Sequence, residues 1–139
     1  MRTKNGEKTG NVLKSLTPML EVTDMDETIG FYHEVLGFEC ANRMEGWALL
    51  LNHDVEIMIS LPNAHTPFEK PRFTGSLYMK LDDVDALWQQ VKDKTTVVYP
   101  LENFHYGMRE FAIRDNNGYC LQFGSEIKDP SQIPPPEQD

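Results

Sequence analysis

The sequence predicts an α+β fold made of two tandem βαβββ units, whose curled mixed sheets surround a cleft and carry their helices on the outside. Two internal matches predict this duplication. Residues 22–26 (VTDMD) recur as residues 81–85 (LDDVD) after 59 positions, and residues 55–59 (VEIMI) recur as residues 119–123 (YCLQF) after 64 positions. Such a repeat largely determines the architecture, because each unit buries one sheet face under its helix and the two units together cover the other.

The composition is that of one globular domain. Of the 139 residues, 40% are hydrophobic and 25% are charged, so the chain can bury a core. The formal net charge of −9 argues against a nucleic-acid partner, which requires clustered cations, and is compatible with a cationic ligand or with solubility alone. No apolar run approaches the roughly 20 residues of a membrane span. The basic residues 1–10 have no apolar stretch behind them, so they do not form a secretory signal.

The first unit is predicted to cover residues 15–61, after a loose arm over residues 1–14. Its first strand, residues 15–22, contains Pro18, which suits a sheet edge because proline cannot donate to a neighbouring strand. Three further strands are predicted at residues 38–43, 46–51 and 55–61.

The second unit is predicted to cover residues 75–125 and begins with a strand at residues 75–81. It follows a connector over residues 62–74 that contains three prolines. A strand rich in β-branched residues is predicted at residues 95–99. A polar, proline-rich tail over residues 126–139 completes the chain, and no structure is assigned to it.

Each unit also contains a helix with a clear start. Asp24 and Asp83 are predicted to cap the two helices, and Gly37 follows the first as a stop signal. Apolar residues lie at helical spacing in both. These are Met25, Ile29, Tyr32 and Leu36 in the first helix, and Val84, Leu87, Trp88 and Val91 in the second.

A hairpin closes the second unit. Its strands, residues 109–114 and 119–123, flank the turn residues 115–118 (DNNG), whose Asn, Asp and Gly accept the required backbone angles. Residues 119, 121 and 123 form an apolar face, while Cys120 and Gln122 point to the opposite face.

Strand alternation predicts which side chains line the cleft. For Trp47 and Phe111 the alternation does not decide which face of the sheet the side chain occupies, and both are kept as candidates for the cleft. The predicted ligand-binding residues are Thr17, Met19, Glu21, Trp47, Glu56, Met58, Ser60, Ser76, Tyr78, Lys80, Phe111, Cys120 and Gln122. This apolar and aromatic lining with a few polar groups is typical of a small-molecule pocket.

No catalytic residue emerges from the pattern. Cys120 has no identifiable base and is also explained as a small strand residue. A carboxylate, Glu21 or Glu56, beside Lys80 could act in acid–base chemistry or form a structural ion pair. The histidines His33, His53, His65 and His105 show no metal-ligand spacing. Cys40 and Cys120 form no CxxC motif, which favours free thiols in a reducing cytoplasm.

The duplication, together with the segments VTDMDETIGFYHEVLGF and REFAIRDNNGYCLQF, makes the chain resemble the vicinal oxygen chelate superfamily. This superfamily includes glyoxalase I, extradiol dioxygenases and the bleomycin resistance proteins. Enzymes of this group hold a divalent metal in the cleft through His, Gln and Glu side chains. The resemblance places those positions at Thr17, Met58, Ser76 and Gln122, a set with no carboxylate or imidazole. We therefore expect no metal and no other cofactor.

The resemblance is greatest to the metal-free, bleomycin-resistance-type branch, whose members are acidic dimers that sequester a cationic glycopeptide without altering it. It implies a cytoplasmic homodimer that binds an aromatic or cationic small molecule, with a role in antibiotic resistance. The alternative is a metal-dependent lyase, isomerase or dioxygenase that uses a non-standard site around Gln122, Glu56 and His105. A pure interaction module is a third alternative, and no pattern in the sequence resembles a peptide groove.

Overall fold

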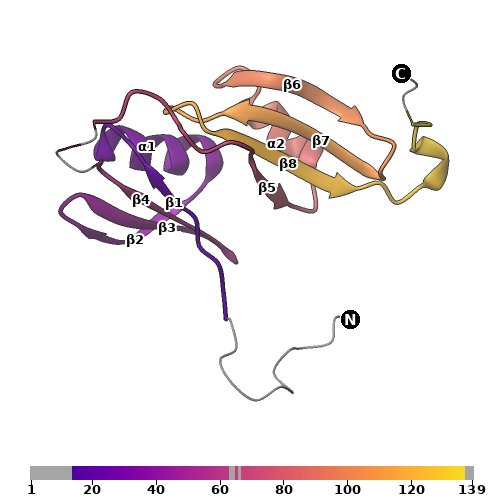
Figure 1. Ribbon diagram of the computed structural model, residues 1–139. Coiled ribbons are helices and arrows are strands. Elements are labelled where there is room, and N and C mark those ends of the chain that lie inside the picture. Colours follow the sequence, from indigo (N-terminus) through magenta and orange to yellow (C-terminus); the bar gives the residue numbers. More distant parts are fainter. Residues whose placement is uncertain (1–13, 63–64, 66, 137–139) are drawn as a thin grey trace, which may run out of the picture.

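The computed structural model describes residues 14–62, 65 and 67–136, and it has the predicted α+β fold with two βαβββ units (Figure 1). The predicted arm lies outside the described residues except for Lys14. The first unit contains β1 (Met19–Glu21), α1 (Met25–Leu36), β2 (Glu39–Met44), β3 (Trp47–Asn52) and β4 (Val55–Ser60). The second contains β5 (Leu77–Lys80), α2 (Val84–Val91), β6 (Thr96–Asn103), β7 (Met108–Arg114) and β8 (Cys120–Glu126).

The two sheets have the same strand order. It is β1-β4-β3-β2 in the first unit and β5-β8-β7-β6 in the second. In each sheet the first and last strands of the unit pair in parallel, and the other neighbours are antiparallel. Neither sheet closes into a barrel, and they lie next to each other (Figure 1). The duplication in the sequence is therefore a duplication of topology.

Two strands that contain or adjoin a proline differ from the predicted bounds. β1 begins at Met19 rather than at residue 15, because Pro18 has no N–H to donate, although its carbonyl accepts from Met58 N at 2.9 Å. β6 runs to Asn103 rather than to residue 99, and it contains Pro100. This proline is tolerated because β6 is an edge strand.

Both helices begin at the predicted aspartates. Asp24 accepts a hydrogen bond from Glu27 N, and Asp83 accepts one from Ala86 N, each at 3.0 Å. Such caps satisfy N–H groups that have no partner within the helix. α1 ends at Gly37, whose φ of 77° lies in the left-handed region that glycine adopts without steric cost.

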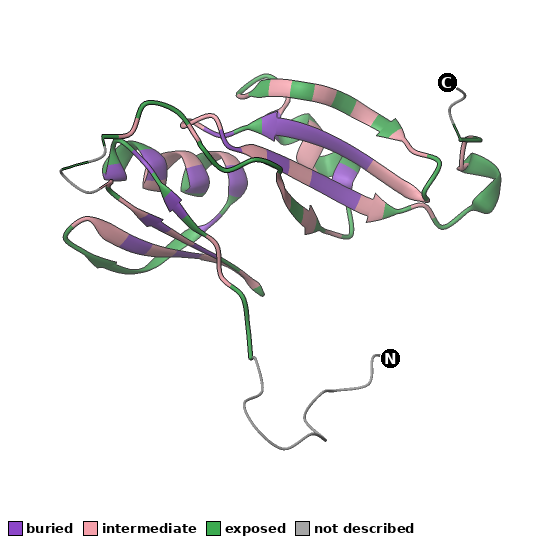
Figure 2. Ribbon diagram, viewed as in Figure 1, coloured by how far each residue is buried: buried purple, intermediate pink, exposed green. Residues whose placement is uncertain are grey.

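The core lies between each sheet and its helix. α1 covers one face of the first sheet and α2 covers one face of the second. Figure 2 shows the buried residues concentrated in these helices and in the central strands. The alternate strand residues Ile57, Ile59, Leu121 and Phe123 are buried there. Their neighbours in sequence, such as Met58 and Gln122, consequently point to the uncovered faces.

The β7–β8 turn joins the two units. Tyr32 of α1 donates a buried hydrogen bond to Asp115 at 2.6 Å, and Tyr119 donates to Glu21 O at 2.7 Å. Asn116 and Asn117 both donate to the hydroxyl of Thr28, at 3.0 and 3.1 Å. The turn therefore fixes the second unit against the start of α1.

The C-terminal segment contains one element that the sequence analysis did not assign. Pro130–Gln132 forms a short 3₁₀ helix with Asp129 as its cap. Asn103 donates to Gln132 O at 3.0 Å, which attaches this part of the tail to β6.

Candidate functional site

A completely buried carboxylate lies on the uncovered face of the second sheet. Glu110 of β7 is 0% exposed. Its Oε1 accepts from the hydroxyl of Tyr78 at 2.8 Å, and its Oε2 accepts from the hydroxyl of Tyr99 at 2.5 Å and from Gln122 Nε2 at 3.4 Å. Among the described residues no Lys or Arg forms an ion pair with it. Hydrogen bonds alone therefore compensate for the burial of this group.

Gln122 connects the carboxylate to the first strand of the unit. Its Nε2 donates to the hydroxyl of Tyr99 at 2.6 Å, and its Oε1 accepts from the hydroxyl of Ser76. Ser76, Tyr78, Tyr99, Glu110 and Gln122 thus form one continuous network across β5, β8, β7 and β6, which we call the Glu110 network.

Gly124 makes the network sterically possible. It pairs in register with Glu110, so it lies between that residue and β5. A Cβ atom at this position would overlap with the hydroxyl of Tyr78 and would come within 3.2 Å of Met108 Cε. The Tyr78 side chain can cross β8 to reach Glu110 because residue 124 has no side chain.

Aromatic rings adjoin the network. Phe104 contacts Tyr99 edge-on, with the ring centroids 5.6 Å apart, and stacks on Tyr106 at 5.5 Å. His105 contacts Tyr106 edge-on at 5.3 Å. Tyr78 and Tyr106 are 40% and 54% exposed, so two aromatic rings near Glu110 are accessible to a ligand.

The tyrosines retain their protons at neutral pH. Burial, followed by the hydrogen bond to Glu110, raises the pKa of Tyr99 to about 12. Burial and the neighbouring Glu110 carboxylate also raise the pKa values of Tyr78 and Tyr106. The hydroxyls therefore act as hydrogen-bond donors to Glu110, and no tyrosinate forms under physiological conditions.

The uncovered face of the first sheet combines apolar side chains with two exposed carboxylates, Glu21 and Glu56. Met19 pairs in register with Met58, Leu49 with Met58, and Trp47 with Ser60. Met19 of β1 is 55% exposed, and Met44 of β2, at the opposite edge of the sheet, is 61% exposed. Within the described residues no side-chain hydrogen bond connects the predicted cleft residues of this face. These residues are Thr17, Met19, Glu21, Trp47, Glu56, Met58 and Ser60.

The predicted cleft residues of the second unit include three members of the Glu110 network, namely Ser76, Tyr78 and Gln122. Lys80 and Cys120 alternate onto the same face of their strands. Lys80 forms no ion pair with Glu21 or Glu56 in the described part of the chain, so the structural ion pair considered from the sequence is not present.

Phe111 was wrongly placed in the cleft. It is fully buried on the covered face, where its ring stacks on Phe123 at 5.3 Å and contacts Trp88 at 5.1 Å. The reason is register: Phe111 pairs directly with Phe123, and directly opposed residues share a face. The uncovered face of β7 therefore carries Glu110 instead.

Sequence reasoning missed Glu110, Tyr99 and Tyr106. A signal for Glu110 was present in the hairpin around residues 115–118. This hairpin pairs Phe111 with Phe123, which lies on the apolar face. Glu110 precedes Phe111 in the strand, so its side chain points to the opposite face. Tyr99 and Tyr106 could not be placed in this way, since β6 contains register shifts and Tyr106 lies in a loop.

The four positions that would hold a metal in superfamily enzymes do not fit that role. Ser76 and Gln122 are hydrogen-bonded to each other, and Thr17 and Met58 supply only a hydroxyl and a thioether. Hard and borderline divalent cations need carboxylates or imidazoles. No cluster of three or more His, Cys, Asp and Glu residues suitable for a metal occurs in the described ranges. The residues present therefore do not match the superfamily metal site.

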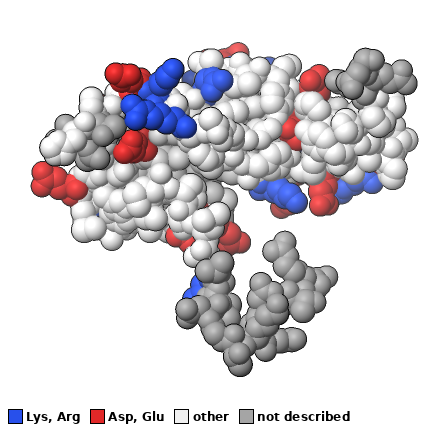
Figure 3. Space-filling model, in the orientation of Figure 1, with Lys and Arg blue, Asp and Glu red and all other residues white. Residues whose placement is uncertain are grey.

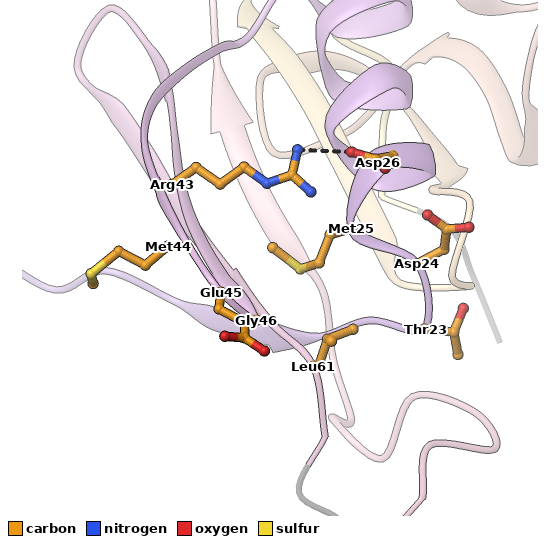
Figure 4. Close-up of a pocket in the computed structure, with 9 residues that line it drawn as sticks. All are labelled: Thr23, Asp24, Met25, Asp26, Arg43, Met44, Glu45, Gly46 and Leu61. Carbon is orange, nitrogen blue, oxygen red and sulfur yellow. Dashed lines mark hydrogen bonds and ion pairs between the residues drawn. The ribbon is translucent and has the colours of Figure 1, made fainter.

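The open hollow drawn in Figure 4 lies away from both uncovered faces. It has a volume of about 550 Å³ and lies between the start of α1 and the β2–β3 turn, where Arg43 bonds Asp26 at 2.7 Å. A second hollow of about 480 Å³ lies between the units, lined by residues that include Phe38, Val55 and Leu87. Neither hollow contains a member of the Glu110 network.

The fold and this site define a class of protein: a duplicated βαβββ chain with uncovered sheet faces and no superfamily-type metal ligands. The profile of the Glyoxalase/Bleomycin resistance protein/Dioxygenase superfamily matches residues 15–123, and the chain belongs to this superfamily. No helix in the described part of the chain is long and apolar enough to cross a lipid bilayer.

Individual relatives agree with this assignment. The chain is 26% identical over 127 residues to bleomycin resistance proteins from Geobacillus stearothermophilus and Staphylococcus aureus, covering 80% of this chain and 96% of theirs. The structure of a bleomycin resistance determinant encoded on transposon Tn5 superposes with a TM-score of 0.68 at 22% identity, over 82% of this chain and 98% of that one. A protein of unknown function from Agrobacterium tumefaciens gives a TM-score of 0.72 at 21% identity, over 85% and 98%.

Proposed function

We propose that this protein binds an aromatic or cationic small molecule against its uncovered sheet faces, without a metal and without altering it chemically. The observation that carries the proposal is the pair of exposed rings, Tyr78 and Tyr106, beside the buried Glu110 carboxylate. Aromatic faces bind flat ligands by stacking and bind cations through the ring quadrupole. Named relatives, the bleomycin resistance proteins, indicate the first ligand to test.

The non-catalytic part of the proposal is supported by the residues available. Glu110 is enclosed by hydrogen bonds, and Ser76 and Gln122 bond each other where a metal would be held. Among the described residues no group of three or more His, Cys, Asp and Glu could hold a metal ion, which favours the binding function over the alternative metal centre around Gln122, Glu56 and His105.

We also propose that the protein acts as a homodimer in the cytoplasm. Met19 and Met44, on the two outer strands of the first sheet, are exposed apolar side chains that a second copy would cover. Cys40 and Cys120 are both free thiols, as expected of a reducing compartment. Sedimentation of the purified protein gives the oligomeric state.

Binding is tested by thermal shift and calorimetry with bleomycin and a panel of aromatic metabolites. A ligand at about 100 times its Kd stabilises the folded state by about 2.7 kcal/mol, which a thermal scan detects. We expect stabilisation by at least one compound, which mass spectrometry should recover unchanged after incubation. Stoichiometric Fe, Zn, Ni or Mn in the purified protein together with turnover of a substrate would instead support the metal-dependent lyase, isomerase or dioxygenase.

A further inference from the structure

The Glu110 network has a fixed direction of hydrogen bonding. A hydroxyl has a single proton, and the protons of Tyr78 and Tyr99 point to the two oxygens of Glu110. The proton of Ser76 points to Gln122 Oε1, and the Nε2 group of Gln122 points to Tyr99. None of these three hydroxyls has a proton left for a ligand.

What remains for a ligand is a set of acceptors. Tyr78 is the accessible member, and its oxygen keeps both lone pairs because it accepts no bond within the described residues. The hydrogen bond to Glu110 also polarises the Tyr78 O–H bond, which makes the tyrosine oxygen a stronger acceptor. The exposed surface of the network therefore suits N–H donors.

Two carboxylates and one lysine lie on this face near the network: Lys80 is exposed and pairs with Gly124, the residue between β5 and Glu110. Glu110 is matched by no cation, and Glu102 of β6 pairs with it in register and is exposed. Arg109, the neighbour of Glu110 in β7, is bound to Asp85 at 2.8 Å. In the view of Figure 3, charged side chains of both signs lie along the lower edge of the second unit, and the area above them is mostly uncharged. The two carboxylates outnumber the lysine, so a positively charged ligand group would meet a net negative charge here.

We propose that Glu110 determines the charge specificity of this face. By taking the protons of Tyr78 and Tyr99 it leaves the Tyr78 oxygen as an acceptor beside aromatic faces. The ligand group that binds here is therefore a flat organic cation with N–H donors, such as an amidinium or guanidinium on an aromatic frame. Glu110 does not touch the ligand and is a positioning residue. The inference rests on the proposed binding function and adds to it a charge preference set by one residue.

The test uses three probes of equal shape: 2-naphthamidine, 2-naphthamide and 2-naphthoate, which are cationic, neutral and anionic. Their dissociation constants are measured by calorimetry at 0.15 M salt, where distant charges are largely screened. We expect the wild-type protein to bind the amidine at least ten-fold more tightly than the carboxylate. In Glu110→Gln the new amide donates to a tyrosine and releases a hydroxyl proton, so this ratio should fall at least five-fold.

The matched control is Glu34→Gln, which removes the same charge from an exposed position on α1 and should leave the ratio within two-fold of wild type. Should Glu110→Gln fail to fold, Tyr78→Phe removes the accessible acceptor and should lower the same ratio. A purely structural role for Glu110 would weaken all three probes equally and would overturn the inference, as would an unchanged ratio or preference for the carboxylate. Equal binding of the three probes by wild type overturns this inference alone. If the aromatic metabolites, bleomycin and these probes all fail to bind, the proposed function is overturned as well.

Discussion

The uncovered faces of the two sheets occupy equivalent places in the repeat but differ in chemistry. On the first sheet the apolar side chains are Met58, Met19 and Trp47. Among the described residues, the predicted cleft residues of this sheet form no side-chain hydrogen bonds with one another. On the second sheet the residue equivalent to Met58 is Gln122, which belongs to a network around a buried carboxylate. The duplicated backbone fixes where side chains point, while the residue at each point decides whether the face attracts apolar surface or a polar ligand.

The turns at the ends of the two hairpins show the same divergence. The β7–β8 turn buries Asp115 against Tyr32 and docks onto α1. In the β3–β4 turn, His53 and Asp54 are exposed and line the hollow of about 480 Å³ between the units. Between the two units, the space at the β7–β8 turn is therefore filled by hydrogen-bonded side chains, whereas the space at the β3–β4 turn is an open hollow.

The largest expected effect tests whether the two cores are equivalent. Ile57→Ala and Leu121→Ala remove matched, fully buried side chains 64 positions apart. Each should lower the free energy of unfolding by about 2–5 kcal/mol, because the lost burial is added to the cost of a cavity. Urea denaturation measures both. A loss below about 1 kcal/mol in only one of them would show that the units do not form a single cooperative core.

An intermediate effect separates the uncovered faces. Gly124→Ala places a methyl group where the Tyr78 hydroxyl lies, so the tyrosine must leave Glu110, at an expected cost of about 1–3 kcal/mol. The matched control is Ser60→Ala, at the equivalent position of the first unit, which should change stability by less than about 0.5 kcal/mol. Equal effects in the two variants would contradict the steric role of Gly124.

The smallest effect concerns pH and the two turns. Burial raises the pKa of Asp115, although its hydrogen bonds with Tyr32 and with turn N–H groups oppose the shift. The folded state then holds the proton more tightly than the unfolded state, so this group's contribution to stability falls as the pH rises from about 4 through the raised pKa. The stability of wild type relative to Asp115→Asn should decline over this range, by at most about 1.4 kcal/mol per pH unit.

The control for that measurement is Asp54→Asn in the exposed β3–β4 turn, whose stability relative to wild type should not depend on pH in this way. Chemical denaturation at several pH values provides the free energies of unfolding. A difference between wild type and Asp115→Asn that stays constant or grows as the pH rises would show that Asp115 is not held in a desolvated site.

The sequence by itself determined the duplication, the two capped helices and the face of most strand residues. These features depend on local spacing: helix caps lie within one turn, and alternation assigns Met58 or Gln122 to a face once the strand is recognised. Pro18 and Pro100 also have local effects, but only the sheet order shows that both lie at tolerated positions near or in edge strands.

Only the tertiary structure decided how the site is assembled. Glu110 meets Tyr78 through the pairing of β5 with β8 and of β8 with β7, and it meets Tyr99 across irregular pairing with β6. The residues of this network lie up to 46 positions apart in the chain, and the register shifts of β6 break the alternation that would have placed Tyr99. Local patterns determine the direction of a side chain along its own strand, but the partner it meets depends on strand order and register, which are set by the packing of the whole unit.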